Sequence, residues 1–76
     1  MIRELDDVVL RTDLPEQGLT GGDVGTVVLV HRGGAGYEVE FTALDGETIA
    51  VVTLRADQLR SVGYREISHV RDLVLA

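Results

Sequence analysis

The stretch Tyr37-Glu38-Val39-Glu40-Phe41-Thr42 (YEVEFT) carries the clearest structural pattern in this chain of 76 residues. The apolar side chains of Tyr37, Val39 and Phe41 alternate with polar ones. Successive side chains of a β-strand point to opposite faces, so this alternation predicts a strand with one buried and one solvated face. We therefore expect Tyr37, Val39 and Phe41 to lie in a hydrophobic core.

One further strand is predicted on each side of this one. Residues 44–47 contain the Asp-Gly pair typical of tight hairpins, so residues 48–54 (TIAVVTL) form the returning strand. Its expected core face consists of Ala50, Val52 and Leu54. On the other side, residues 25–31 (GTVVLVH) are apolar at both odd and even positions. This pattern predicts a strand that is buried on both faces or that bends between two sheets, as barrel strands do. A flexible loop over residues 32–36 joins it to the next strand.

The remaining segments complete a small β-domain. Residues 8–10 (VVL) predict a first strand, and the Gly-rich residues 13–22 predict a long surface loop after it. Residues 55–58 fit one turn of 3₁₀ helix, and residues 59–62 fit a fifth short strand. About five antiparallel strands in this order are typical of an SH3-like barrel. The alternative is an open five-stranded meander that a partner chain completes.

The end of the chain is richer in aliphatic residues than a free tail needs to be. We divide the chain into a barrel over residues 1–64 and a C-terminal extension over residues 65–76. Ile67, Val70 and Val74 have helical spacing, while residues 70–75 also alternate as in a strand. We expect the extension to pack as a short helix or strand, on the barrel or on a partner chain. The candidate partner contacts are Tyr64, Leu73, Val74 and Leu75.

Composition argues against several classes of function. Seven Arg, no Lys and thirteen carboxylates give a net charge of −6, which opposes binding to nucleic acid and to anionic membranes. No apolar run reaches the roughly 18 residues that span a membrane. The absence of Cys excludes disulfides and thiolate zinc sites and fits a cytoplasmic protein. A chain this short buries little surface, which favours a homodimer.

No arrangement of residues in the sequence indicates catalysis. Ser68 and His69 are neighbours, so their side chains diverge instead of facing each other as a nucleophile and its base must. His31 lies far from His69, and no metal-ligand spacing occurs. Glu38 and Glu40 share a strand face, but such pairs are common on solvated faces. We predict a protein that is not an enzyme and that has no catalytic residue, cofactor or metal.

Several blocks together resemble a known family. They are DDVVL (residues 6–10), DLPEQGL (13–19), GDVGTVV (22–28), YEVEF (37–41) and VTLRADQL (52–59). In this order they look like the domain of unknown function 4926 family. The resemblance implies a small bacterial protein with an SH3-like fold and without known catalytic residues, in a two-gene module of the toxin–antitoxin kind. The GDVGTV block also resembles a KOW segment, in which the Gly permits the turn into a strand.

Three classes of function follow. We favour a non-enzymatic protein-interaction module, antitoxin-like or immunity-like, whose acidic surface binds a basic partner encoded nearby. The alternatives are a KOW-like barrel associated with nucleic acid and an accessory domain of an enzyme complex.

Overall fold

The computed structural model describes residues 1–73 and contains five β-strands and two single-turn 3₁₀ helices. In chain order the elements are β1 (Asp7–Leu10), η1 (Pro15–Gln17), β2 (Val24–His31), β3 (Gly36–Thr42), β4 (Thr48–Arg55), η2 (Ala56–Gln58) and β5 (Leu59–Ser61). This confirms the mostly-β fold and the order of strands, loop and 3₁₀ turn that the sequence predicts. Within the described residues no helix has the length and apolar character needed to cross a membrane.

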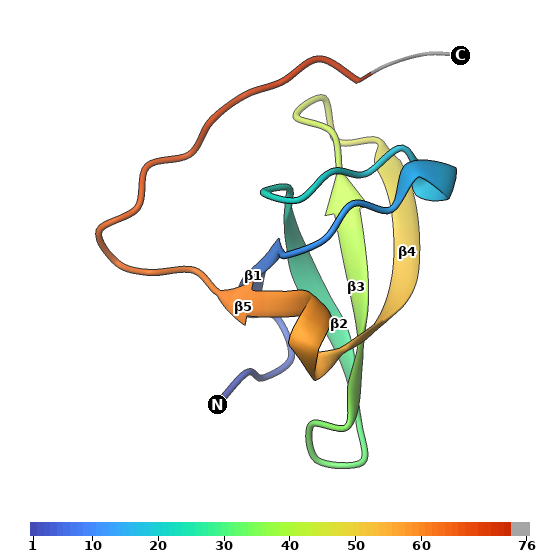
Figure 1. Ribbon diagram of the computed structural model, residues 1–76, viewed down its shortest axis with the longest axis vertical. Coiled ribbons are helices and arrows are strands. Elements are labelled where there is room, and N and C mark those ends of the chain that lie inside the picture. The colour runs from blue at the N-terminus through green and yellow to red at the C-terminus, as the bar shows by residue number, and fades with distance from the viewer. Residues whose placement is uncertain (74–76) are drawn as a thin grey trace.

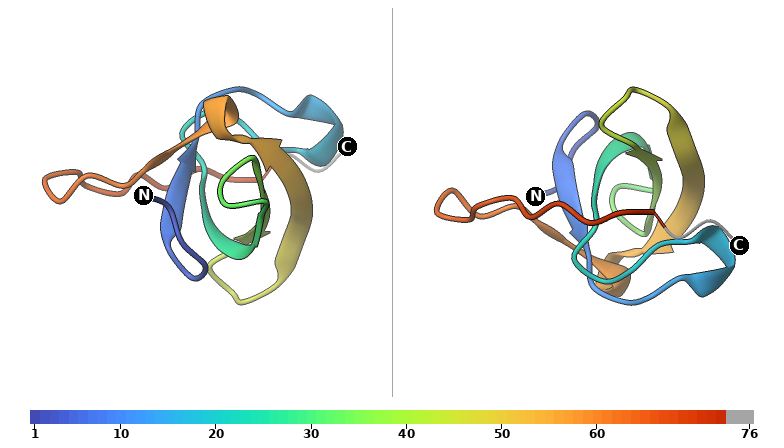
Figure 2. Two further views of the ribbon diagram at one scale, coloured as in Figure 1. Left: turned by 90° about the horizontal axis from the view of Figure 1, so that it is seen from below. Right: turned by 90° about the horizontal axis from the view of Figure 1, so that it is seen from above.

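All neighbouring strands are antiparallel and form one sheet in the order β4-β3-β2-β1-β5. The sheet curls so strongly that its two edge strands, β4 and β5, are joined by the single turn of η2 (Figure 1). Viewed along the curl, β1 to β4 surround a central space (Figure 2). The fold is therefore a small all-β, barrel-like domain made from one open sheet.

The core fills the inside of this curl. Tyr37, Val39 and Phe41 of β3 are buried, and β4 places Leu54 opposite Tyr37 and Val52 opposite Val39. The predicted inward faces of both strands are thereby confirmed, with Ala50 partly buried against the core. The other buried members of the cluster are Val8, Leu10, Leu19, Val27 and Leu59.

Of the two interpretations of β2, burial on both faces is wrong for the middle of the strand. Val27 is fully buried, but Val28 and Leu29 are 41% and 43% exposed. The pairing with β3 passes from Val27↔Val39 directly to Leu29↔Glu38, so Val28 is an extra residue in a β-bulge. The bulge changes which side chains face inward and leaves two aliphatic residues on the outer surface.

The segment between β1 and β2 is more than the surface loop that was predicted. It folds back as a small hairpin in which Leu14 pairs with Leu19 around η1. Gly18 makes the turn possible, because it adopts a left-handed conformation with φ of 71°. The hairpin inserts Leu19 into the core, where only 4% of its surface remains exposed.

Gly22 of the GDVGTV block, with φ of 100°, lies in the turn that precedes β2, whereas Gly25 of the same block has a different role. It lies inside β2, opposite Val8 of β1, and is not among the residues with positive φ. A Cβ atom at this position would come within 2.6 Å of Val39 Cγ1 and 2.9 Å of Phe41 Cε1. Gly25 is therefore required because β2 and the β3 side chains pack too closely for any side chain.

The prediction that the extension forms a helix or a strand is wrong for its described part. Residues 62–73 contain only a turn at residues 64–65. The segment leaves β5, swings away from the barrel and returns across one end of it (Figures 1 and 2). We call residues 62–73 the tail.

Candidate functional site

A groove lies between the tail and the barrel. Its floor combines outward-facing residues of β5, β1 and β2 with the core residues Leu19 and Phe41, which border the groove at this end of the barrel. In this half of the sheet Val9 pairs with Arg60 on one side and with Val24 on the other. Residues directly opposite each other in antiparallel strands share a face, so Val24, Val9 and Arg60 form one row. Val9 is buried yet stands outside the core cluster. The floor is thus largely aliphatic.

The tail and the β3–β4 loop form the walls of the groove. From the tail, Ile67, Val70 and Leu73 border the space, and from the loop Leu44 does. The space is about 860 Å³ in volume and is open to solvent. Ile67 is 95% exposed and Val70 is 69% exposed, so these aliphatic side chains border the groove without packing against its floor.

One end of the tail is tied to the β1–β2 segment by Arg71. Its Nη2 and Nε donate hydrogen bonds of 2.6 and 2.8 Å to the two carboxylate oxygens of Asp23. Nη2 also donates to the carbonyl oxygen of Gly18 at 3.0 Å. The Arg71 guanidinium holds the pKa of Asp23 below its ordinary value. Bidentate pairs of this kind are the strongest arginine contacts, and they fix geometry as well as energy.

The other end of the tail is tied to β5 by Glu66. Arg60 donates from Nη1 and Nη2 to the two Glu66 oxygens at 2.8 and 2.7 Å, and the backbone N–H of Gly63 donates to the same carboxylate. The Arg60 contact, helped by Gly63, lowers the pKa of Glu66 from 4.5 to about 2. Both ends of the tail are therefore held by arginine–carboxylate pairs, with residues 67–70 between them.

These pairs leave the groove with a negative charge. Its two bordering arginines, Arg60 and Arg71, are both neutralised. Asp7 and Asp72 also border it, and no cation of residues 1–73 forms a salt bridge with either. The surface thus combines aliphatic side chains with unpaired carboxylates, a chemistry that suits a basic and apolar partner.

The predicted partner contacts lie in different places. Tyr64 is 97% exposed at the outward bend of the tail and does not border the groove. Leu73 is 38% exposed and does border it. Val74 and Leu75 lie outside the described residues. The sequence-based candidates did not include Ile67 and Val70, which border the groove and whose aliphatic character in a polar stretch was the available signal.

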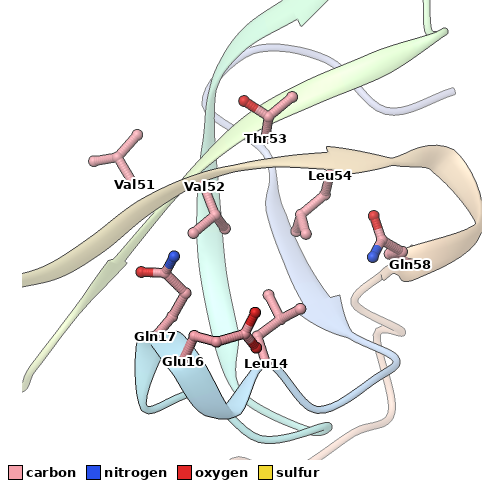
Figure 3. A pocket seen from close by; sticks show the side chains of 8 residues that line it. All are labelled: Leu14, Glu16, Gln17, Val51, Val52, Thr53, Leu54 and Gln58. Carbon is pink, nitrogen blue, oxygen red and sulfur yellow. The ribbon is translucent and has the colours of Figure 1, made fainter.

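A second hollow lies on the other side of the barrel, between η1 and the free edge of β4 (Figure 3). Val52 and Leu54 point towards Leu14, with Glu16 and Gln17 at the rim, while Val51 points away. The hollow has a volume of about 290 Å³, and its apolar walls are side chains of the core and its edge. It is smaller than the groove and offers a partner less apolar surface.

Glu38 and Glu40, the two carboxylates that share a strand face, accept hydrogen bonds from neighbouring side chains. Glu38 accepts hydrogen bonds of 2.7 Å from His31 and from Thr53, which together lower its pKa. Glu40 accepts one of 2.6 Å from Thr48. In residues 1–73 no three His, Cys, Asp or Glu side chains gather closely enough to hold a metal ion. Ser68 and His69 make no hydrogen bond with each other in this part of the chain.

The aspartates of the β1–β2 segment stabilise turns. Asp13 accepts a hydrogen bond of 2.8 Å from the backbone N–H of Gly21. Asp23 accepts one of 2.9 Å from Thr20, in addition to its pair with Arg71. Such local side-chain bonds are the usual role of Asp in turns.

Comparison with known proteins agrees with the sequence blocks. No curated protein and no solved structure matches this chain. A family described as Domain of unknown function (DUF4926) matches residues 4–61, which include all five strands and end where the tail begins. The chain therefore belongs to the domain of unknown function 4926 family.

Proposed function

We propose that this protein is a non-enzymatic protein-interaction module that binds a basic partner protein in the groove beneath its tail. The observation that carries this proposal is the lining of the groove. Aliphatic side chains of the tail are held over an aliphatic floor. Within residues 1–73 both bordering arginines are neutralised, and Asp7 and Asp72 form no salt bridge. Exposed apolar surface rimmed by polar groups is typical of protein-interaction sites.

The distribution of charge supports a basic partner. Residues 1–61 carry eleven carboxylates and five arginines, whereas residues 62–76 carry two of each. The whole net charge of −6 therefore belongs to the barrel, and the tail is neutral. An acidic barrel accelerates encounter with a basic protein and disfavours acidic ones, while burial of the aliphatic side chains supplies affinity.

Within this class we favour a neutraliser, antitoxin-like or immunity-like, that acts in the cytoplasm of a bacterium on a partner encoded nearby. The resemblance to the family and the order of elements typical of SH3-like barrels support this choice. Co-expression tests it directly. If the neighbouring gene product inhibits growth, this chain should relieve the inhibition, and an Ile67→Asp variant should relieve it less.

Site-specific photo-crosslinking tests the general proposal. A p-benzoylphenylalanine replaces Ile67, which borders the groove, or Val51, which is 55% exposed on the far edge of the barrel. Both sites tolerate a large side chain because both are exposed. After irradiation in host cells, we expect a discrete adduct with a basic protein from position 67 and none from position 51. Equal adducts from both positions, or none from either, would contradict the proposal.

Filter binding with host RNA distinguishes the nucleic-acid alternative. We expect no retention at physiological salt, because the net charge of −6 repels phosphate. Retention that falls steeply as salt rises would contradict a protein-binding role and support a KOW-like one.

A further inference from the structure

The two arginine pairs divide the tail into fixed ends and a free middle. Arg60–Glu66 fixes the tail where it leaves β5, and Arg71–Asp23 fixes it on the far side of the groove. The second pair joins residues 48 positions apart in sequence. It is therefore the contact that brings the returning part of the tail back across the barrel.

Most of the backbone of residues 67–73 is unpaired within the described chain; the exception is the carbonyl oxygen of Asp72, which accepts a hydrogen bond of 3.4 Å from Arg71 Nη1. No backbone–backbone hydrogen bond of the described chain involves residues 67–73, while Glu66 bonds Gly63 at the turn. These residues also form no helix or strand. Exposed donors and acceptors in a row accept an added strand readily. Seven residues in extended form span about 20 Å, enough to pair with a segment of similar length.

The tail therefore provides both kinds of contact that an extended peptide uses. Its backbone offers hydrogen bonds, and the groove floor offers Val9 and Val24 as apolar surface. Asp7, which accepts a hydrogen bond of 3.2 Å from the Thr26 hydroxyl, and Asp72 lie at the border of the same space, and no cation of the described chain forms a salt bridge with either. In peptide recognition by strand addition, main-chain bonds give affinity and side-chain pockets give specificity.

We propose that the tail is a clasp, an inference that rests on the proposed function and deepens it. The occupant is an extended segment of the partner protein, with aliphatic side chains flanked by Lys or Arg. It lies between residues 67–73 and the groove floor and pairs with the tail backbone. The Arg71–Asp23 pair closes over it and so slows its release.

A displayed peptide library provides the probe. Random twelve-residue peptides on phage are selected on the full chain and counter-selected on an Ile67→Asp/Val70→Asp double variant. We expect enrichment of peptides with two or more aliphatic residues flanked by Lys or Arg. No enrichment, or enrichment of acidic peptides, would overturn the proposal. Peptides that bind the double variant equally well would also overturn it.

The dissociation rate of a selected peptide then tests the clasp. Arg71→Gln removes the pair with Asp23, and Arg65→Gln removes the same charge from a tail residue that forms no salt bridge or hydrogen bond in the described chain. We expect Arg71→Gln to speed dissociation five- to tenfold with less than a twofold change in association, and Arg65→Gln to leave both rates unchanged. Equal dissociation from the two variants would overturn the clasp.

These outcomes separate the clasp from the proposed function. If position 67 gives an adduct but the peptide dissociates equally fast from the two Arg variants, the proposed function stands and the clasp is wrong. Absence of any adduct removes the interaction module itself. Light scattering distinguishes a second copy as occupant, because a dimer that Arg71→Gln dissociates would contradict a separate basic partner.

Discussion

Replacement of Gly25 by Ala tests the packing of the barrel most sharply. The added Cβ would lie 2.6 Å from Val39 Cγ1, 2.9 Å from Phe41 Cε1 and 3.0 Å from the carbonyl oxygen of Glu40. Carbon atoms in contact normally lie about 3.5–4.0 Å apart, so the overlap with Val39 is about 1 Å. Both side chains are buried, and the oxygen belongs to the β3 backbone, so relief requires β2 and β3 to move apart.

The expected cost follows from overpacking. Extra methyl groups in a packed core cost about 1–3 kcal/mol, and three simultaneous close contacts place this site at the upper end. Ala restricts the unfolded chain more than Gly does, and this effect stabilises the folded state by about 0.4–1 kcal/mol. We expect a net loss of about 2 kcal/mol from a total of about 4–11 kcal/mol for a chain of this length. The melting temperature should fall by about 8–16 °C.

Urea unfolding followed by far-ultraviolet circular dichroism measures this loss. The slope of the unfolding free energy against urea should stay unchanged, because the same surface is exposed. Gly36→Ala is the matched control: it also lies in a strand, and its added Cβ would meet nothing closer than 3.5 Å. We expect this control within about 0.5 kcal/mol of the parent. If Gly25→Ala were as stable as Gly36→Ala, the packing account of Gly25 would be refuted.

Three further predictions concern the loop and the tail. Leu19→Ala should lower the free energy of unfolding in urea by about 2–4 kcal/mol, because Leu19 is buried. Leu44→Ala, at an exposed position, should lower it by less than about 0.5 kcal/mol. Equal losses would mean that the loop does not insert into the core. The pKa of Glu66 is lowered to about 2. Its pair with Arg60 should therefore hold the tail above pH 4.5 and weaken as the pH falls towards 2. An NMR titration of the Glu66 carboxyl with a midpoint near pH 4.5 would disprove the pair. A chain ending at Val62 should melt within a few degrees of the full chain, because no core residue among residues 1–73 follows Leu59. Loss of cooperative melting would show that the tail is needed for folding.

The strands were predictable where local pattern decides them. Tyr37, Val39 and Phe41 alternate with polar residues, and each of them is buried as that alternation requires. The Asp-Gly pair correctly marked the turn between β3 and β4. Such signals depend only on neighbouring residues, because the direction of side chains in a strand has a period of two.

Features that depend on distant partners were not predictable. Leu19 lies in a Gly-rich segment, and its burial depends on the hairpin with Leu14 and on strands far along the chain. The exposure of Val28 depends on a bulge that is defined only by pairing with β3. The path of the tail depends on Arg71 reaching Asp23, and nothing near Arg71 in the sequence specifies that partner.

The groove as a surface was not predictable from the sequence. An excess of aliphatic residues near the end of the chain made the tail a candidate for partner contacts, which stays a prediction. It also suggested a helix or a strand, because Ile67 and Val70 fit helical spacing. In the structure, two ion pairs tie the ends of the tail to the barrel, and the residues between them stay apart from it. The groove therefore arises from these ion pairs and not from secondary structure in the tail.

Hydrogen exchange of the complex tests the central claim, that the partner binds in the groove beneath the tail. The partner is the protein that cross-links to position 67, purified and added in excess. Backbone amides of residues 67–73 have no backbone partner within the part of the chain that the structure describes, so they should exchange rapidly in the free protein and slowly in the complex. Amides of β4 should be unchanged. Protection confined to β4 and η1, with residues 67–73 still exchanging rapidly, would contradict the claim.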